Sequence, residues 1–149
     1  DLVRSRGLGD VYKRQTKYKI VLVGTNKSID SILPKEIISI HRTTNQEELA
    51  QIYSASDLFV NPTREENYPT VNMESLACGT PVLTFKTGGS PEIIDEKTGC
   101  VVDVDDVDLM LKRIVEICTE KTLLKSDCVN KAKSFDKKEK YIEYIKLYK

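Results

Sequence analysis

Short apolar runs alternate with longer stretches of helical periodicity along most of this chain. The runs predict strands because they are brief, rich in Val, Ile and Phe, and bounded by Gly, Pro or Asn. The predicted strands are residues 18–24, 37–41, 57–62, 81–85 and 100–102, and the first of them is expected to be buried. The helical pattern covers residues 45–55, 69–79, 106–119, 122–133 and 136–148, with a short helix begun by Pro91. This alternation is typical of βα units, so we predict an α/β fold with a Rossmann-like parallel sheet and flanking helices.

Two of the predicted helices carry boundary signals. Asn45 followed by Glu48 forms a capping box, in which side chains accept hydrogen bonds from the first free N–H groups of the helix. Pro69 fits the first position of the next helix, because that position needs no N–H donor. Gly79 can adopt the left-handed conformation that ends the same helix. This helix therefore begins just after the third predicted strand.

The last predicted helix, within residues 136–149, carries an aromatic stripe. Tyr141, Tyr144, Ile145 and Tyr148 follow the spacing i, i+3, i+4, i+7 and share one face. Two interpretations stay open: a partly exposed stripe that binds other apolar surfaces, or a stripe that packs fully on its own domain.

Composition narrows the class of protein. The 149 residues are 40% hydrophobic and 31% charged, which suits one globular domain. Lys and Arg together number 23, as do Asp and Glu, so no overall charge favours nucleic acid as a partner. No apolar run approaches the roughly 20 residues of a membrane span, and no signal peptide opens the chain. We expect a soluble cytoplasmic protein, with peripheral attachment to the inner face of the membrane left open.

No metal site is predicted. The four cysteines contain no CxxC pair, and the single His41 does not complete a usual zinc set with them, so reduced thiols are expected. The acidic run at residues 103–108 contains a D-x-D triplet of the kind seen at metal sites. Aspartates just ahead of a helix also serve as caps and dipole partners, and we favour that interpretation. His41 is expected to be a strand-end residue rather than a catalytic base.

Residues 1–15, DLVRSRGLGDVYKRQ, follow neither period and do not lead into the first strand. The string resembles a translated sequencing adapter, so we interpret it as a non-native leader. A disordered basic tail is the alternative. On the first interpretation, residues 16–149 form a domain that is incomplete at its N-terminus.

The helix that follows Pro69 carries candidate chemistry. Thr70 and Glu74 fall on one line along it, with Met73 and Ala77 as apolar neighbours. A carboxylate among apolar neighbours is costly without a partner. A helix N-terminus at the carboxyl end of a strand is a ready anion site. Glu74 lies roughly 7.5 Å along the axis from Pro69 at a rise of about 1.5 Å per residue, which is about the offset between a diphosphate and its ribose.

Glu66, in the loop before this helix, lies on the other side of such a diphosphate, where a phosphate-linked sugar is expected. Two carboxylates that bracket a phosphate-binding helix start suit a nucleotide-sugar. On these residues alone an alternative stays open: Glu74 is an ordinary helix residue, and Glu66 is a favourable charge near the helix N-terminus.

Several motifs in this region also carry a family resemblance. They are Glu66 and Glu74 as an E-x7-E pair, ACGTPV at 77–82, a GG-x-x-E segment at 88–92 and a T-G turn at 98–99. With these motifs the chain resembles the carboxyl-terminal domain of retaining glycosyltransferases with the GT-B fold, in the family usually numbered four. A bacterial branch that acts in surface-polysaccharide and colanic-acid-type assembly is similar as well. The resemblance covers about residues 17–149.

The resemblance implies roles for individual residues. Glu74 is expected to bind the donor ribose, and Glu66, as the catalytic carboxylate, to lie near the transferred sugar. The family has Gly-Phe-Gly where this chain has Asn67, Tyr68 and Pro69. Proline has no N–H, so the donors to the phosphates are expected from the next two residues. The expected donor contacts are Glu74, Thr70, Val71, Tyr68 and Arg42.

Arg42, directly after a predicted strand, is included because the arginine and lysine that neutralise the donor diphosphate in the family have no match here. The implied protein is the truncated carboxyl-terminal, donor-binding half of a GT-B enzyme. It transfers a hexose from a nucleotide-sugar to a glycan or lipid-linked glycan, with retention, in bacterial polysaccharide biosynthesis, and needs no cofactor or metal. The acceptor is expected on an amino-terminal domain missing from the sequence, so the chain alone is not expected to transfer sugar. Two alternatives are a GT-B nucleotide-sugar epimerase and a non-catalytic nucleotide-binding module.

Overall fold

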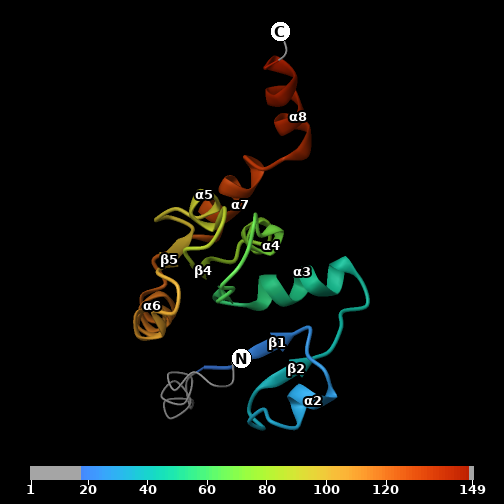
Figure 1. The fold of residues 1–149 in the computed structure, drawn as a ribbon, viewed down its shortest axis with the longest axis vertical. Helices are drawn as coiled ribbons and strands as arrows, with labels where there is room; N and C mark the ends of the chain where they lie inside the picture. The colour runs from blue at the N-terminus through green and yellow to red at the C-terminus, as the bar shows by residue number, and fades with distance from the viewer. Residues whose placement is uncertain (1–17, 148–149) are drawn as a thin grey trace. The chain divides into compact units, whose positions relative to one another are not determined.

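The computed structural model of the chain describes residues 18–147. Residues 1–15, interpreted from the sequence as a leader, lie outside the described residues. The chain divides into two compact units, one ending at Leu49 and the other running from Ala50 to the carboxyl end. The boundary falls within helix α3 (Gln46–Ala55), and Figure 1 labels most elements of the two units.

The first unit contains two short parallel strands, β1 (Val21–Val23) and β2 (Ile38–Ile40), with Val21 opposite Ile38. Helix α2 (Lys27–Asp30) lies between them in sequence and was not predicted. Its N-cap residue is Asn26, whose side chain accepts hydrogen bonds from the N–H groups of Ser28 and Ile29, each at 3.0 Å.

The prediction of a buried strand at residues 18–24 is wrong on burial. The two valines of β1 are 38% and 42% exposed. Among the described residues β1 pairs with β2 alone, and a two-stranded sheet leaves much of its side-chain surface in water.

The predicted capping box of α3 is confirmed for its first member, Asn45. The Asn45 Oδ1 atom accepts a hydrogen bond from the Glu48 N–H at 2.8 Å. The Glu48 carboxylate does not close the box on Asn45 but accepts from the N–H and hydroxyl of Thr44, at 2.6 and 2.8 Å. The backbone hydrogen bond from Thr44, and then the one from its hydroxyl, lower the pKa of Glu48 below its usual value.

The second unit is built on a parallel three-stranded sheet with the order β3-β4-β5. The strands are β3 (Phe59–Asn61), β4 (Val82–Phe85) and β5 (Gly99–Val102). All four residues of the central strand β4 are buried. Each strand lies within its predicted range or begins one residue before it, so the predicted α/β fold class with parallel strands is confirmed.

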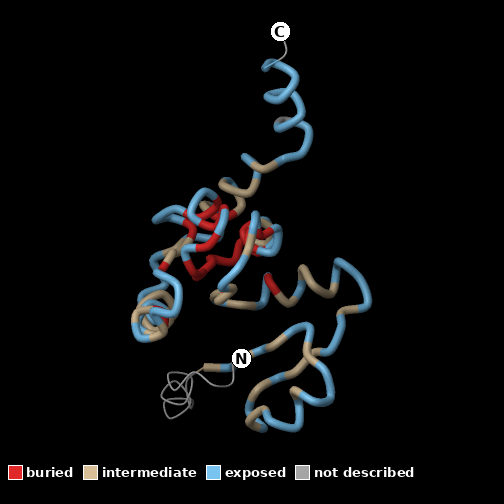
Figure 2. The backbone as a smooth tube through the Cα atoms, in the orientation of Figure 1, coloured by how far each residue is buried: buried red, intermediate tan, exposed pale blue. Residues whose placement is uncertain are grey.

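The core of this unit has two halves, one on each face of the sheet. Side chains alternate between faces along a strand, so Val82 and Leu83 of β4 contribute to different halves. One half joins Val82 to Leu76, Ile93, Ile94 and Cys128, and the other joins Leu83 to Phe85, Val102 and Met110. Figure 2 shows the buried residues of the unit concentrated around β4 and the helices beside it.

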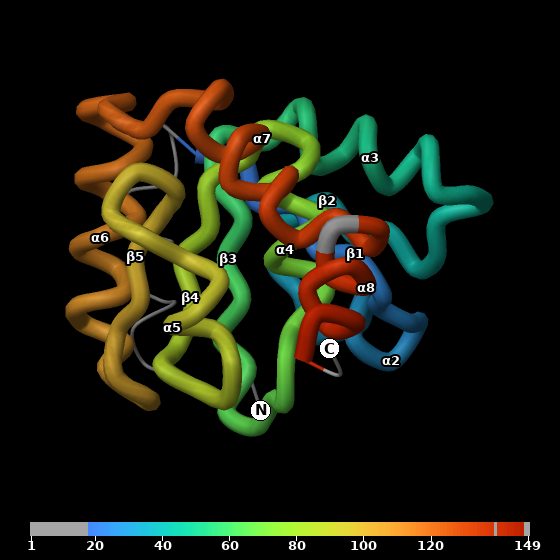
Figure 3. The backbone as a smooth tube through the Cα atoms, turned by 90° about the horizontal axis from the view of Figure 1, so that it is seen from above, coloured from blue at the N-terminus to red at the C-terminus, as the bar shows by residue number. Residues whose placement is uncertain are grey.

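Five helices follow the strands of the second unit. They are α4 (Thr70–Ala77), α5 (Ser90–Ile93), α6 (Val107–Glu120), α7 (Lys125–Lys133) and α8 (Lys137–Lys146). Figure 3 shows α6 on one side of the three strands and α4 with α7 on the other. Among the described residues, no helix is both long and apolar enough to cross a membrane.

The aromatic stripe of α8 is exposed where the structure describes it. Tyr141 and Tyr144 are each 58% exposed, and Ile145 is 55% exposed. Tyr148, the last residue of the predicted stripe, lies outside the described residues. Of the two interpretations left open by the sequence, partial exposure therefore holds for these three side chains.

Candidate functional site

The candidate site is built where β3 leads through a loop into α4, at the carboxyl edge of the sheet. Pro69 is the N-cap residue, one position before the predicted one, because its ψ of 102° is extended and helical dihedral angles begin at Thr70. No side chain caps this end of the helix. The N–H groups of Thr70 and Val71 have no acceptor within the helix, so they are available to an anion.

The other end of α4 follows the prediction. Gly79 has a φ of +79°, the left-handed conformation that glycine adopts without strain. The Gly79 N–H donates to the Leu76 carbonyl at 2.9 Å, and the Thr80 N–H donates to the Ser75 carbonyl at 3.0 Å. These two bonds form a Schellman motif, which satisfies the last carbonyls of the helix.

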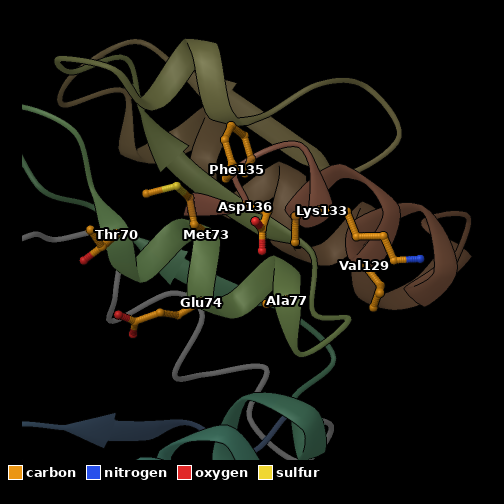
Figure 4. A pocket seen from close by; sticks show the side chains of 9 residues that line it. Thr70, Met73, Glu74, Ala77, Val129, Lys133, Phe135 and Asp136 are labelled. Atoms are coloured by element: carbon orange, nitrogen blue, oxygen red, sulfur yellow. The ribbon is translucent and has the colours of Figure 1, made fainter. Parts of the chain in front are cut away.

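Glu74 lies on α4 one turn beyond Thr70, and both side chains are exposed. With Met73 and Ala77 they line a cavity of about 500 Å³, whose opposite wall comes from α7 and the residues that follow it. Figure 4 shows the Glu74 carboxylate pointing away from Phe135 and the other residues of that wall. The predicted apolar neighbours are therefore present, and because Glu74 is exposed, the cost of a carboxylate left among them without a partner does not arise.

Glu74 acts electrostatically on Tyr53 of α3. Tyr53 is 7% exposed, and its ring meets Phe59 edge to face, with ring centroids 5.2 Å apart. Burial and then the Glu74 charge raise the pKa of Tyr53 to about 12, so its phenol is neutral near pH 7.

Glu66 and Tyr68 lie in the loop before α4 and do not line the cavity that Glu74 lines. Glu66 is partly buried, and its Oε1 atom accepts a hydrogen bond from the Asn67 N–H at 3.2 Å. Tyr68 is 43% exposed. Earlier in the loop, Arg64 Nε lies 2.6 Å from Asp105 Oδ1 in the turn before α6. The structure thus places one candidate carboxylate ahead of the helix and the other along it.

A buried polar layer beneath the loop was missed in the sequence. The side-chain amide of Asn61 donates to Asn72 Oδ1 at 2.9 Å, and both residues are buried. The Thr63 hydroxyl donates to Asn61 Oδ1 at 2.5 Å, and the Thr84 hydroxyl donates to the Asn61 carbonyl at 2.9 Å. The sequence signal was an asparagine at the end of a strand and another on the buried side of the next helix.

In the acidic run at residues 103–108, one aspartate caps a helix and another forms an ion pair. Asp106 is the N-cap of α6, and its Oδ1 atom accepts from the Leu109 N–H at 3.0 Å, which confirms the capping interpretation for this residue. Among residues 18–147, no group of three or more His, Cys, Asp or Glu could hold a metal ion. All four cysteines, each within that range, are free thiols.

His41 and Arg42 belong to the first unit and directly follow β2. The His41 ring lies 2.5 Å, Nε2 to Oδ2, from Asp30, so it is a strand-end residue with a partner of its own. The hydrogen bond from Ser39, and then the one from His41, lower the pKa of Asp30. Arg42 is exposed and belongs to the first unit, whereas Glu66 and Glu74 belong to the second.

Comparisons with known proteins agree with this fold. The D-inositol 3-phosphate glycosyltransferase of Corynebacterium jeikeium is 43% identical over 61 residues, which are 40% of this chain and 15% of that protein. A GDP-mannose-dependent alpha-(1-6)-phosphatidylinositol monomannoside mannosyltransferase of Mycolicibacterium smegmatis is 28% identical over 130 residues. That match covers 77% of this chain and 34% of the mannosyltransferase. The chain therefore spans about a third or less of the length of these relatives.

Two solved structures show the same fold at low identity. Sucrose-phosphate synthase from Thermosynechococcus elongatus superposes with a TM-score of 0.79 at 23% identity, covering 95% of this chain and 40% of the synthase. Anabaena HepE in complex with UDP superposes with a TM-score of 0.66 at 17% identity, covering 88% of this chain and 40% of HepE. These neighbours support the expected GT-B type of fold.

A family model described as glycosyl transferases group 1 matches residues 6–120, which is more than half of the chain. The match includes the loop before α4, the helix itself and the glycine-rich turn after β4. The chain belongs to the glycosyl transferases group 1 family.

Proposed function

We propose that this chain binds the nucleotide-sugar donor of a retaining glycosyltransferase, which transfers a hexose to a glycan in bacterial polysaccharide biosynthesis. The observation that carries the proposal is the uncapped N-terminus of α4, with Glu66 in the loop before it and Glu74 one turn along it. The names of two similar proteins point to the same class of ligand, since one is GDP-mannose-dependent and the other was solved with UDP.

In this proposal each group of the site binds a different part of the donor. The N–H groups of Thr70 and Val71 donate to the diphosphate, and the positive end of the α4 dipole lies next to it. The Glu74 carboxylate accepts hydrogen bonds from the ribose hydroxyls, because it lies about one turn farther along the axis. Glu66 and Tyr68 face the transferred sugar, and Arg42 adds positive charge near the nucleotide.

The chemistry rests on stabilisation of the leaving group. As the bond between sugar and phosphate breaks, negative charge grows on the diphosphate. Hydrogen-bond donors already aimed at that charge lower the barrier without reorganising. No metal takes part in this proposal, so the diphosphate charge is met by helix N–H groups and cationic side chains. The acceptor, a glycan or lipid-linked glycan, is bound by other parts of the whole protein, which acts in the cytoplasm or attached to the inner face of the membrane.

Calorimetry of the chain with UDP, GDP and ADP, and with UDP-glucose, GDP-mannose and ADP-glucose, tests the proposal. One base is expected to bind preferentially, the sugar-bearing form more tightly than the nucleoside diphosphate, and EDTA should change neither result. Where Glu74 or Glu66 is replaced by Gln, Glu120→Gln at the far end of α6 is the control for a general loss of negative charge. A chain that binds none of the six compounds contradicts the proposal. Isomerised sugar recovered after incubation would instead indicate an epimerase.

A further inference from the structure

The glycine pair that follows β4 lies directly against the loop that carries Glu66. Gly88 has a φ of +46°, and a Cβ atom on it would lie 1.9 Å from the Glu66 carbonyl oxygen and 2.4 Å from that of Asn67. Both neighbouring atoms belong to the backbone, which cannot turn aside as a side chain can. A side chain at position 88 therefore requires the loop itself to move.

Gly89 provides the space for the ring of Tyr68. A Cβ atom at position 89 would lie 2.1 Å from Tyr68 Cδ2 and 2.7 Å from Cε2. The Gly89 N–H also donates to the Asn67 carbonyl at 2.6 Å, which links the turn to the loop by a hydrogen bond. Because Tyr68 is partly exposed, its ring can rotate away from a side chain at position 89. A side chain at position 89 is therefore accommodated more easily than one at position 88.

Thr87, just before the glycines, holds the start of the same loop. It is 8% exposed, and its hydroxyl donates to the Thr63 carbonyl at 3.2 Å. The turn is itself fixed on the sheet, because the Lys86 N–H donates to the Val102 carbonyl of β5 at 2.7 Å. One turn anchored on the sheet thus contacts the loop at Thr63 and again at residues 66–68.

We propose that residues 87–89 are positioning residues that fix Glu66 and Tyr68, and that they determine selectivity for the intact nucleotide-sugar over the nucleoside diphosphate. The inference rests on the proposed function. The diphosphate and ribose are bound by α4, which does not depend on the turn for its own hydrogen bonds. The sugar is bound by the loop, which depends on the turn for its position. A displaced loop therefore loses the sugar contacts and keeps the nucleotide contacts.

Gly88→Ala and Gly89→Ala test this inference, with Gly79→Ala as the matched control. Gly79 also has a positive φ, so its substitution introduces backbone strain, but at the far end of α4 and away from the loop. Gly88→Ala is expected to weaken binding of the intact nucleotide-sugar about tenfold to hundredfold, the loss typical of small misplacements, with the nucleoside diphosphate within about twofold. Gly79→Ala should lower the melting temperature and leave the ratio of the two affinities unchanged.

Two further measurements separate positioning from a general loss of stability. Hydrogen exchange of residues 63–69 should be faster in Gly88→Ala than in the wild type, and unchanged in Gly79→Ala. In a Tyr68→Ala background, Gly89→Ala should have no additional effect on selectivity, because the ring that it displaces is gone. If Gly88→Ala fails to fold, Thr87→Val, which removes the hydroxyl bonded to Thr63, takes its place in each measurement.

The outcomes distinguish the inference from the proposed function. A wild-type chain that binds nucleotides, combined with equal losses for both ligands or with unchanged exchange of the loop in Gly88→Ala, overturns the positioning role alone. A wild-type chain that binds neither the nucleoside diphosphates nor the nucleotide-sugars overturns the proposed function and the selectivity together. Faster exchange with loss of only the sugar-bearing ligand supports the inference.

Discussion

Asn72→Ala removes the acceptor from a buried hydrogen bond beneath the candidate site. Asn72 is fully buried, and its Oδ1 atom accepts from the Asn61 amide at 2.9 Å. In the variant, the Asn61 amide stays buried without that acceptor. Because Asn61 is the last residue of β3 and Asn72 lies in the first turn of α4, the change loosens the strand and helix that position the loop.

The expected magnitude follows from two opposing terms. A buried donor left without a partner costs about 1–3 kcal/mol, and the cavity left by the amide adds to it. Against this, the Asn72 Nδ2 atom has no hydrogen-bond partner among the described residues, so its removal relieves part of an existing cost. We expect a net loss of about 1–3 kcal/mol in the free energy of unfolding, which lowers the melting temperature by about 3–10 °C for a chain of this size.

Urea unfolding followed by circular dichroism measures this loss, with the slope m unchanged if the compactness of both states is preserved. Asn130→Ala on the exposed side of α7 is the matched control and should stay within about 0.5 kcal/mol of the wild type. The double variant with Asn61→Ala should lose less than the sum of the two single variants, because both remove the same hydrogen bond. An Asn72→Ala variant as stable as the control would refute the reasoning.

Three further predictions concern other parts of the molecule. The contribution of Tyr53 to the free energy of unfolding should be fully present below pH 10 and be lost as the pH rises toward 12, because unfolded tyrosine releases its proton near 10.0 while Tyr53 holds it to about 12. In urea titrations between pH 9 and 11.5, Tyr53→Phe should lack this pH-dependent loss of stability. Cys128 is fully buried, and burial raises the pKa of its thiol to about 11, so a thiol-specific colorimetric reagent should modify it only in urea. Modification of Cys128 in native buffer at the rate of the unfolded chain would contradict this prediction. The exposed face of α8 should bind a hydrophobic dye, and the double change Tyr141→Ser and Ile142→Ser should reduce its fluorescence; unchanged fluorescence would place the dye elsewhere.

Local signals predicted most of the elements. The strand ranges held because short apolar runs between turn residues leave few other structures possible, and Asn45, Gly79 and Asp106 mark helix ends through bonds to their own neighbours. The one-residue difference between the predicted and observed start of α4, at Pro69, also has a local cause. A fixed φ near −70° suits both the cap and the first helical position, and only ψ distinguishes them.

Properties that depend on distant neighbours were not predictable in the same way. The exposure of β1 depends on which elements cover it, and the exposure of Glu74 depends on the direction that its side chain takes beside α7. The bond between Asn61 and Asn72 joins a strand end to a helix across eleven positions, which no local period encodes. The separate motifs that contain Glu66 and Gly88 predicted the family, whereas the contact between these two residues required the folded chain.

The central claim is that Glu74 binds the ribose and Glu66 the sugar at the start of α4. Calorimetry of Glu74→Gln and Glu66→Gln with the preferred nucleoside diphosphate and its sugar-bearing form tests it most directly. Loss of the charge that strengthens two hydrogen bonds is expected to cost about 1.5–3 kcal/mol, so Glu74→Gln should weaken the nucleoside diphosphate about tenfold to hundredfold. Glu66→Gln should weaken only the sugar-bearing form. Equal losses in the two variants for the nucleoside diphosphate, or binding abolished by EDTA, would contradict the account.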